Sequence, residues 1–549
     1  MKKSNLLKKA VSVLLVASAL AGCGSSASQA PAAAGTETSE AATEAASSES
    51  SAEPGTITMA MVSAWDSIIP FDTTSSYSDA VLDLIYDKLV YLKQDGTYEP
   101  RLADKWSMSD DNKVLTVHLN ENAKWQDGEP VTADDVVFTM QVYNSPSAAV
   151  VRQNNVSPFA GFKEGDDSLQ VKAVDEHTVE MTCAEPTNMD FLFFIKFRDI
   201  YILPKHLLGD TPYADIRNNS YWEKPIGSGP CIYESQISGE RMEFKANKDY
   251  YLKTPQWDRF VVKVVATPSL LSGLMNDEID ILAGNVASLQ LSDWDMAKQQ
   301  QNLTCVSTES VGYQYMAINT EKDYLPPKVR QAIDMAINRD AIVSGLLKGE
   351  GEPAFGPFAT SHKYYDDVVN VGYNPEKAKE LLAEAGWDGS HELVFSVPTG
   401  NSIREQAAVI IQQNLQEIGI KTKIESADFA THLTKVREGN YDLGLIGSGG
   451  SPDPSECVIN FKPDHINNFS HLSDWTIYNT GAEGEHAFSF EDRKVNYDNY
   501  QELLVEQVPF CFLYFQNNLF AYNNRIGNVK DNQDYSQLNR DVWNWTIEK

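Results

Sequence analysis

The pattern of apolar and polar positions changes near Thr56, where the chain becomes a succession of strand-like and helix-like segments. Residues 56–62 and 114–119 are rich in apolar and β-branched side chains, and the second segment alternates apolar with polar positions, as a half-buried strand does. Residues 132–144 have a helical pattern, with Thr132 as N-cap and two aspartates in the first turn. These segments predict a large folded body that begins near residue 56.

The clearest alternation of elements lies in the second half of the chain. Asn374 and Pro375 predict the start of a helix, and Gly386 predicts its end. Three strands and two helices follow, at residues 392–398, 403–418, 421–428, 429–439 and 441–447. Because strands that are joined by helices usually pair in parallel, this run predicts an α/β unit with a largely parallel sheet.

The first 55 residues have a different character. Four lysines precede an apolar segment from Ala10 to Leu20, which is shorter than the roughly 20 residues that cross a bilayer and matches the central part of a secretory signal. Leu20-Ala21-Gly22-Cys23 resembles the lipobox of bacterial lipoproteins, in which a peptidase cuts before the cysteine and the cysteine receives lipid (palmitate and related acyl chains). An ordinary cleaved signal with an incidental cysteine is the alternative.

Residues 24–55 contain no aromatic and no basic residue. Such a segment buries too little apolar surface to offset its ordering entropy, so we expect a disordered tether. The sequence therefore predicts a signal peptide at 1–22 and a lipidated Cys23 with its linker at 23–55. We expect the body to lie at the extracellular face of the cell membrane (the periplasmic side where an outer membrane exists).

Composition narrows the function classes. The 549 residues have a formal net charge of −32, which argues against nucleic-acid binding because phosphates require basic partners. No apolar run after the signal approaches membrane-spanning length. The cysteines after Cys23 are widely spaced and mostly flanked by apolar residues, which favours buried, inert thiols: Cys183, Cys231, Cys305, Cys457 and Cys511.

The sequence shows no catalytic constellation. It lacks the phosphate-loop, dinucleotide, zinc-protease and nucleophile-elbow patterns. The Gly-rich segment 447–454 has no phosphate-loop lysine, and His465 with His471 is a weak metal pair that suits a polar surface loop better. We therefore expect no metal and no cofactor, and the combination of a tether with a multi-domain α/β body suggests capture of a small solute outside the membrane.

Several blocks resemble the family 5 extracellular solute-binding proteins, the dipeptide, oligopeptide and nickel-binding group of ABC importers. The blocks occur in the family's order and cover nearly all of the chain after the linker: 102–139, 226–234, 313–354, 373–387, 439–454 and 505–529. Each block alone is weak evidence, whereas together they are specific.

The resemblance implies an α/β fold of the periplasmic-binding-protein-like type II class, with two lobes, a hinge and an extra domain inserted in the first lobe. The implied segments are domain I at 56–86, 203–310 and 526–549, the inserted domain II at 87–202, and the second lobe, domain III, at 311–525. It also implies a binding protein rather than an enzyme, acting as a monomer that delivers its solute to an ABC permease. A lipoprotein hydrolase and a sensory or chaperone lipoprotein are the alternatives.

The resemblance also suggests where the solute binds. Peptide-binding members place an aspartate in the loop after the strand that corresponds to 441–447, and it pairs with the α-amino group of the peptide. Here Ser451 falls at that place, and Asp453 follows two residues later, where the family has a structural Asp-Pro. A serine hydroxyl recovers less than the roughly 1.5–3 kcal/mol of a charge-assisted hydrogen bond. Peptide stays the leading solute, with oligosaccharides and nickel chelates as alternatives.

Three regions supply the candidate solute-binding residues. They are Ala64, Trp65 and Asp66 after the first strand, Tyr313 and Tyr315 at the entry to the second lobe, and Gly449, Gly450, Ser451 and Asp453 in the loop opposite, with Asn517 and Asn518 as weaker candidates near the return crossing. Trp65 has core packing as its alternative, and the two tyrosines could form the buried face of a strand, with one in the cleft. Trp106 and Trp125 are assigned to structure.

Overall fold

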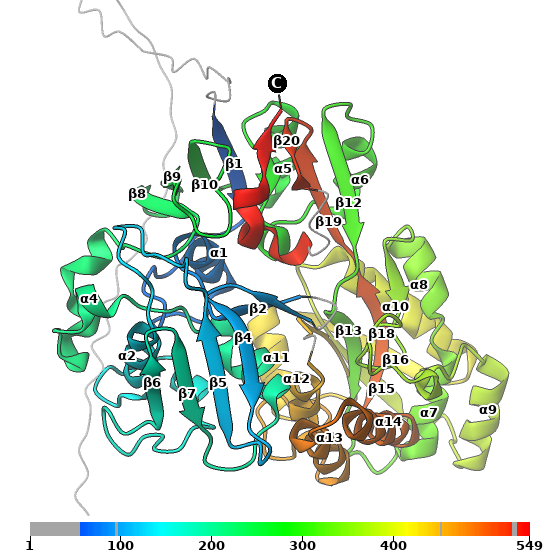
Figure 1. Ribbon diagram of the computed structural model, residues 1–549. Coiled ribbons are helices and arrows are strands. Elements are labelled where there is room, and N and C mark those ends of the chain that lie inside the picture. The colour runs from blue at the N-terminus through cyan, green and yellow to red at the C-terminus, as the bar shows by residue number, and fades with distance from the viewer. Residues whose placement is uncertain (1–54, 94–96, 451–452, 530–534, 549) are drawn as a thin grey trace, which may run out of the picture. The chain divides into compact units, whose positions relative to one another are not determined.

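The computed structural model describes residues 55–93, 97–450, 453–529 and 535–548 (Figure 1). All of them fall within one compact unit of the chain, residues 50–549. Cys23, the linker up to residue 54, and Ser451 lie outside the described residues.

A seven-stranded sheet forms one part of the structure. Its order is β12-β19-β11-β1-β10-β9-β8. The strands are β1 (Thr56–Met61), β8 (Cys231–Ile237), β9 (Arg241–Ala246), β10 (Arg259–Val264), β11 (Ile281–Leu282), β12 (Leu303–Thr308) and β19 (Asn518–Asn523). β1 pairs in parallel with β10 and β11, whereas β19 runs antiparallel to both β11 and β12. The carboxyl ends of β1, β11 and β12 and the start of β19 therefore lie at the same edge.

A second sheet of six strands has the order β14-β18-β13-β17-β15-β16. The strands are β13 (Tyr313–Ile318), β14 (Gly351–Pro353), β15 (Glu392–Pro398), β16 (Lys421–Ala427), β17 (Leu443–Ser448) and β18 (Phe510–Gln516). β15 pairs in parallel with β16 and β17, which confirms the predicted α/β unit. β13 runs antiparallel to β17 and β18, and β14 antiparallel to β18, so the rest of the sheet is not parallel.

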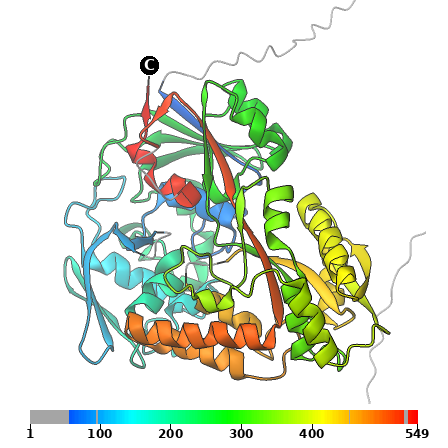
Figure 2. The same ribbon diagram turned by 90° about the vertical axis from the view of Figure 1, so that its right-hand side faces the viewer.

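The chain passes between the two sheets twice. The first crossing is residues 309–312, between β12 and β13, and the return crossing is Asn517, between β18 and β19. Figure 2 shows β18 and β19 as one extended path from one sheet to the other. We expected the second lobe to extend to residue 525, but residues 518–523 pair with β12 and belong to the seven-stranded sheet. The predicted boundary at residue 525 thus lies eight residues beyond the return crossing, which is at Asn517, where the sequence had placed the weaker candidates Asn517 and Asn518.

A four-stranded antiparallel sheet lies within the segment predicted as the inserted domain. Its order is β4-β5-β7-β6. The strands are β4 (Ala103–Met108), β5 (Val114–Leu119), β6 (Val171–Asp175) and β7 (Thr178–Thr182), and a two-stranded ribbon pairs β2 (Val90–Leu92) with β3 (Tyr98–Pro100). Helix α2 (Ala133–Asn144) begins with a capping box between Thr132 and Asp135, as its sequence predicts. One continuous apolar core joins this sheet to the seven-stranded sheet, and we call the two together the first lobe.

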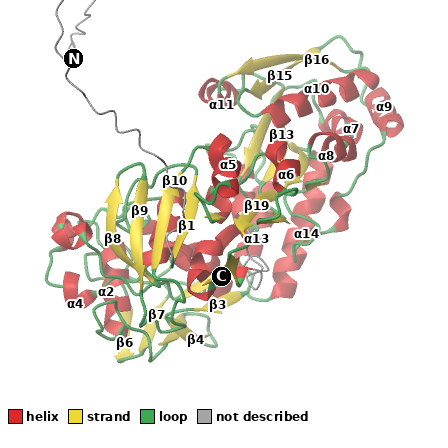
Figure 3. Cartoon of the chain, turned by 90° about the horizontal axis from the view of Figure 1, so that it is seen from above, coloured by secondary structure: helices red, strands yellow, loops and turns green. Residues whose placement is uncertain are grey.

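The six-stranded sheet and the helices around it form the second lobe. These helices are α7 (Pro327–Ala336), α8 (Arg339–Leu346), α9 (Pro375–Glu384), α10 (Ser402–Glu417), α11 (Phe429–Arg437), α12 (Ser455–Val458), α13 (Thr476–His486) and α14 (Phe490–Gln507). Figure 3 shows α7, α8, α9 and α10 beside the strands of this sheet. Alternate residues of β13 enter two different cores, since Met316 belongs to one and Tyr315 to the other. The sheet is therefore buried on both faces.

The remaining elements complete the described chain. They are α1 (Ser76–Ile85), α3 (Met189–Phe191), α4 (Lys205–Leu208), α5 (Leu270–Met275), α6 (Leu291–Ala297) and the ribbon of β20 (Ile526–Gly527) with β21 (Thr546–Ile547). Among the described residues, no helix has the length and apolar character that a membrane crossing needs. All five cysteines in these residues are free thiols, and four of them are buried, as predicted; Cys305 is partly exposed.

Candidate functional site

The topology brings strand ends from both lobes to the two crossings. In the first lobe, the carboxyl ends of β1, β11 and β12 share the edge from which the chain leaves for β13. In the second lobe, β15 and β17 end at the edge where β13 begins and β18 ends. Ligands of α/β proteins commonly bind beyond the carboxyl ends of strands. The edges that the crossings join are therefore the candidate site.

On the first lobe, Ala64, Trp65 and Asp66 follow β1 at this edge. Trp65 is partly buried, and its Nε1 donates to Oε1 of Gln236 at 2.7 Å. The Asp66 side chain is exposed, and its carboxylate accepts hydrogen bonds from Ser78 and from Thr73, the latter at 2.7 Å. Burial acts to raise the pKa of Asp66, but these hydrogen bonds outweigh it and the pKa lies below its ordinary value. Trp65 packs against the rim of the first-lobe core, in line with its core-packing alternative, and is also oriented by this hydrogen bond, whereas Asp66 is an ionised group near the surface.

Tyr313 and Tyr315 are both buried, with 1% and 2% of their surface exposed. Their rings pack on each other and on Phe512 and Phe510, within a core of the second lobe. Their burial matches the first part of the alternative, the buried face of a strand, but not its second part, because neither ring is exposed at the edge where one of them was expected in the cleft. Gln314, between them, points to the opposite face and is partly exposed.

The loop after β17 contacts the first crossing. Gly450 has φ +66°, and a Cβ atom there would lie 1.8 Å from the carbonyl oxygen of Val311. Only glycine fits both the left-handed conformation and this close approach. Gly449 is exposed, and Ser451 lies outside the described residues. The Gly-rich character of the loop is thus explained in part by its contact with the crossing, independently of any phosphate.

Asp453 does not lie free at this edge. It is 3% exposed and forms an ion pair with Arg493 of α14, 2% exposed, at 2.9 Å. Its carboxylate also accepts hydrogen bonds from the backbone and hydroxyl of Ser455. Asp453 was a candidate for binding a solute amine, but the structure gives it the structural role that its Asp-Pro context suggests.

Arg493 also reaches the first lobe. Its Nη1 lies 3.4 Å from Oδ2 of Asp190, and Tyr98 donates to the other oxygen of the same carboxylate at 2.5 Å. A second pair between the lobes joins Arg198 to Glu456 at 3.1 Å, and Asn188 donates to the carbonyl oxygen of Ala487. The segment 188–198 therefore holds the second lobe by polar contacts. Sequence reasoning missed these residues, because isolated charges carry no signal of a partner some 300 positions away.

The return crossing has its own hydrogen bonds. Asn517 donates from its backbone to the carbonyl oxygen of Glu350 at 3.1 Å and from its side chain to Ser307 at 2.9 Å. Asn518 pairs with Thr308 at the start of β19. Both asparagines thus fix the crossing, and both remain partly exposed there.

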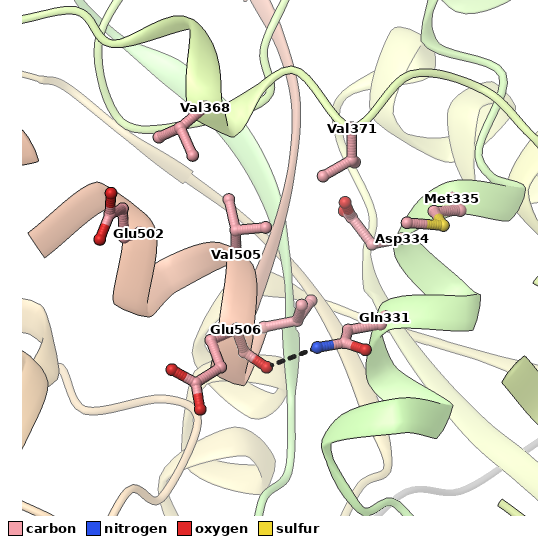
Figure 4. A pocket seen from close by; sticks show the side chains of 9 residues that line it. Gln331, Asp334, Met335, Val368, Val371, Glu502, Val505 and Glu506 are labelled. Atoms are coloured by element: carbon pink, nitrogen blue, oxygen red, sulfur yellow. Dashed lines mark hydrogen bonds between the residues drawn. The ribbon is translucent and has the colours of Figure 1, made fainter. Parts of the chain in front are cut away.

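The described part of the chain also contains a cavity of about 280 Å³ within the second lobe (Figure 4). It lies between α7, the segment 368–371 and the end of α14, and its lining combines aliphatic with acidic side chains: Gln331, Asp334, Met335, Val368, Val371, Glu502, Val505, Glu506 and Val508. Gln331 closes one side with a hydrogen bond of 2.8 Å to the carbonyl oxygen of Glu506. None of the predicted site residues lines this cavity.

Comparison with known proteins decides between the functional classes considered so far, a solute-binding protein and a hydrolase. The sequence model of the bacterial extracellular solute-binding proteins, family 5, matches residues 97–468. The chain belongs to this family. Its members bind solutes and are not enzymes, so the prediction of a binding protein is confirmed and that of a hydrolase is set aside.

One sequence relative and two solved structures extend the comparison, and the structures bear on the fold alone. The oligopeptide-binding protein AppA of Bacillus subtilis is 27% identical over 515 residues, which are 86% of this chain and 89% of the relative. The substrate-binding protein CtaP of Listeria monocytogenes has a TM-score of 0.80 at 24% identity, and the match covers 90% of this chain and all of that one. NikZ of Campylobacter jejuni, solved with Ni(L-His), has a TM-score of 0.70 at 24% identity over 90% and 99% of the two chains. The type II two-lobed fold predicted for this family 5 protein is confirmed.

Proposed function

We propose that this family 5 protein is the lipid-anchored receptor of an ABC importer, which captures a di- or oligopeptide between its lobes and passes it to a membrane permease. The observation that carries the proposal is the geometry of the two crossings. Residues 309–312 and Asn517 join two independently packed sheets, and Trp65, Gly449 and Gly450 lie at the edges that they join. Such a connection permits a hinge motion, and a solute that contacts both lobes favours the closed form.

Cys23 supplies the proposed anchor. Its context favours cleavage after Gly22 and lipid attachment, and residues 24–55 give the body reach from the membrane. Metabolic labelling with an alkyne analogue of palmitate tests this step. We expect label on the wild-type protein and none on Cys23→Ala; an unlabelled wild type, or a labelled Cys23→Ala, contradicts the anchor.

A non-peptide solute is the second candidate, and one observation favours it. Arg493 occupies the carboxylate of Asp453, and Ser451 replaces the aspartate that pairs with a peptide amine in peptide-binding members. A peptide would then be held without the amine contact that such members use. NikZ, solved with a nickel–histidine complex, shows that this fold accommodates other solutes.

A thermal-shift screen distinguishes the candidates. The panel contains peptides of two to nine residues, the same peptides with acetylated N-termini, oligosaccharides, and Ni(II) with L-histidine. A ligand at 100 times its Kd stabilises the protein by about 2.7 kcal/mol. If acetylated peptides stabilise the protein as well as free peptides do, the result supports both a peptide cargo and the absence of an amine contact. If only oligosaccharides or only the nickel complex stabilise the protein, that solute takes the place of peptide in the proposal. If acetylated peptides no longer stabilise the protein, an amine acceptor exists and the argument from Ser451 is wrong.

A further inference from the structure

Three polar contacts, which we call the clasp, join segment 188–198 of the first lobe to the second lobe: Asp190 with Arg493 at 3.4 Å, Arg198 with Glu456 at 3.1 Å, and Asn188 with the carbonyl oxygen of Ala487. Leu192 and Phe197 of this segment belong to the core of the first lobe, whereas Cys457 and Val458, next to Glu456, belong to a core of the second. A rotation that separates the lobes therefore pulls the clasp partners apart.

The first-lobe partner Asp190 is held in place by its own lobe. The Asn188 side chain caps the short helix α3, because its oxygen accepts from the backbone of Asp190 at 2.7 Å. Tyr98 donates to the Asp190 carboxylate at 2.5 Å, and the Tyr98 ring packs against Trp106 and Phe193. The carboxylate of Asp190 therefore keeps its orientation when the second lobe moves away.

The second-lobe partner Arg493 is fixed in the same way. Its guanidinium pairs with Asp453 at 2.9 Å and donates to the carbonyl oxygen of Gly484 at 3.1 Å and to the hydroxyl of Tyr497 at 3.3 Å. All three partners lie on the second lobe, and Nη1 of Arg493 is directed at Asp190. Two groups that are each fixed in advance lose little conformational entropy when they meet.

The loop after β17 connects the clasp to the candidate site. Gly450 contacts the first crossing, and Asp453 and Glu456 follow in the same segment as the partners of Arg493 and Arg198. A solute that rests on this loop therefore acts on the segment that carries two of the clasp partners.

A second set of contacts between the lobes lies at the return crossing. Lys348 of the second lobe pairs with Asp295 of α6 at 2.9 Å, and Trp294 of α6 donates to Glu350 at 2.5 Å. The backbone carbonyl of Glu350 accepts from Asn517, the crossing residue itself. Partners beside the point of rotation stay close when the lobes rotate, so we expect these contacts in both the open and the closed form.

We propose that the clasp favours the closed form of the protein and thereby raises its affinity for every solute by the same factor. This rests on the proposed function in one respect, that the lobes open and close around the solute. The apparent Kd equals the Kd of the closed form divided by the fraction of protein that is closed before the solute binds. Loss of the clasp lowers that fraction whatever the chemistry of the solute, whereas loss of a contact in the cleft affects only the solutes that use it. Asp190, Arg198 and Glu456 are then positioning residues, which act through the arrangement of the lobes.

Pulsed electron resonance tests the clasp without any solute. The spin labels replace exposed residues of the two lobes in a chain that lacks the partly exposed native thiol: Val174→Cys, Val409→Cys and Cys305→Ser. The clasp variants are Asp190→Asn and Arg198→Gln, and the control Lys348→Gln removes the ion pair at the return crossing. We expect both clasp variants to move the distance distribution to longer distances and the control to leave it unchanged. An unchanged distribution in both clasp variants, or an equal shift in the control, overturns the proposal.

Isothermal titration on the full chain measures the common factor. The probes are alanine peptides of two to six residues, and Ni(II) with L-histidine. For each probe that binds the wild type, we expect Asp190→Asn to weaken binding about 3- to 10-fold and Arg198→Gln about 2- to 5-fold, each by the same factor for all probes. The control Glu180→Gln removes a carboxylate that is as exposed as that of Asp190, 32%, but pairs with Lys172 within the first lobe, so it should bind as the wild type does.

An exchange of charges separates the contact from a structural effect. Arg198→Glu and Glu456→Arg each place like charges opposite each other, and the double variant restores an opposite pair, so it should recover part of the affinity that the single variants lose. Factors that differ more than about 3-fold between probes, or a double variant no better than the weaker single one, overturn the clasp alone. If no probe binds the wild type, the proposed cargo fails, and the distance measurement without solute decides the clasp by itself.

Discussion

The ion pair between Asp453 and Arg493 engages the carboxylate that the sequence offered as a candidate for binding a solute amine. Both side chains are almost fully buried, and they meet at 2.9 Å. Arg493 has three further acceptors, the carbonyl oxygen of Gly484, the hydroxyl of Tyr497 and Asp190. Burial opposes the charge, but Asp453 and the other partners raise the pKa of Arg493. Replacement of Arg493 by Met would leave the buried Asp453 charge without its partner.

The expected cost of that change follows from its burial. Removing one member of a buried ion pair typically destabilises a protein by about 3–5 kcal/mol, a large part of the 5–15 kcal/mol of a typical domain. Asp453→Asn should cost less, because it removes the charge but keeps acceptors for Ser455 and Arg493. The double variant should recover about 2 kcal/mol relative to the sum of the single variants, because it no longer contains the unpaired charge.

Urea denaturation at pH 7, followed by tryptophan fluorescence, measures these free energies of unfolding. The control is Arg437→Gln, which lies on the surface of the same lobe and should change stability by less than about 0.5 kcal/mol. A coupling energy below about 0.5 kcal/mol between positions 453 and 493 would refute the reasoning. Asp453 would then be available to a solute, and the argument against an amine contact would fail.

Three further predictions concern other parts of the molecule. Gly450→Ala should lower the free energy of unfolding by about 1–3 kcal/mol, measured by denaturation, and should weaken solute binding, measured by titration. The control Gly372→Ala is also at positive φ but has open space around it, so it should lower the stability less and leave binding intact. Burial, with Arg404 and Lys435 nearby, lowers the pKa of His432 to about 4. Because this pKa lies below the unfolded value near 6.5, the stabilising contribution of His432 is present above pH 6.5 and is lost as the pH falls towards 4. Denaturation of His432→Gln, measured as a function of pH, should lack that loss. Burial raises the pKa of Cys457 to about 12, so a thiol reagent at pH 8 should modify the partly exposed Cys305 first; faster modification of Cys457 would contradict the packing.

The fold could be predicted from the sequence where local signals were strong. The capping residues Thr132 and Asn374 mark helix starts that the structure confirms. The Asn374 side chain accepts from the backbone of Lys377, whereas Thr132 donates from its backbone and its hydroxyl to Asp135 in the first turn, and both are local contacts. The strands of the α/β unit also agree with the prediction to within two residues. The end of the second lobe was predicted too late, at residue 525, although Asn517 was expected near the return crossing, since β18 and β19 are both apolar strands in one run of sequence. Nothing local distinguishes a strand of one sheet from a strand of the other.

The candidate site was less accessible from sequence. Trp65 and Gly449 follow strands whose carboxyl ends lie at the edges that the crossings join, and their role as solute contacts stays a prediction. Alternation alone could not show that both tyrosines of β13 are buried, which depends on the helices that cover the second face. The pairing of Asp453 with Arg493 depends on a contact between distant segments. Such contacts become visible only when the fold places the residues together.

The central claim is that a solute binds between the two lobes and favours their closure. Spin labels at Val174→Cys on β6 and Val409→Cys on α10, which are 52% and 46% exposed, allow the distance between the lobes to be measured by pulsed electron resonance in a chain that also carries Cys305→Ser, which removes the partly exposed native thiol. With the tightest binder from the thermal-shift panel, we expect the distance distribution to narrow and shift to the shorter distances of the closed form. A saturating ligand that leaves the distribution unchanged would contradict the account.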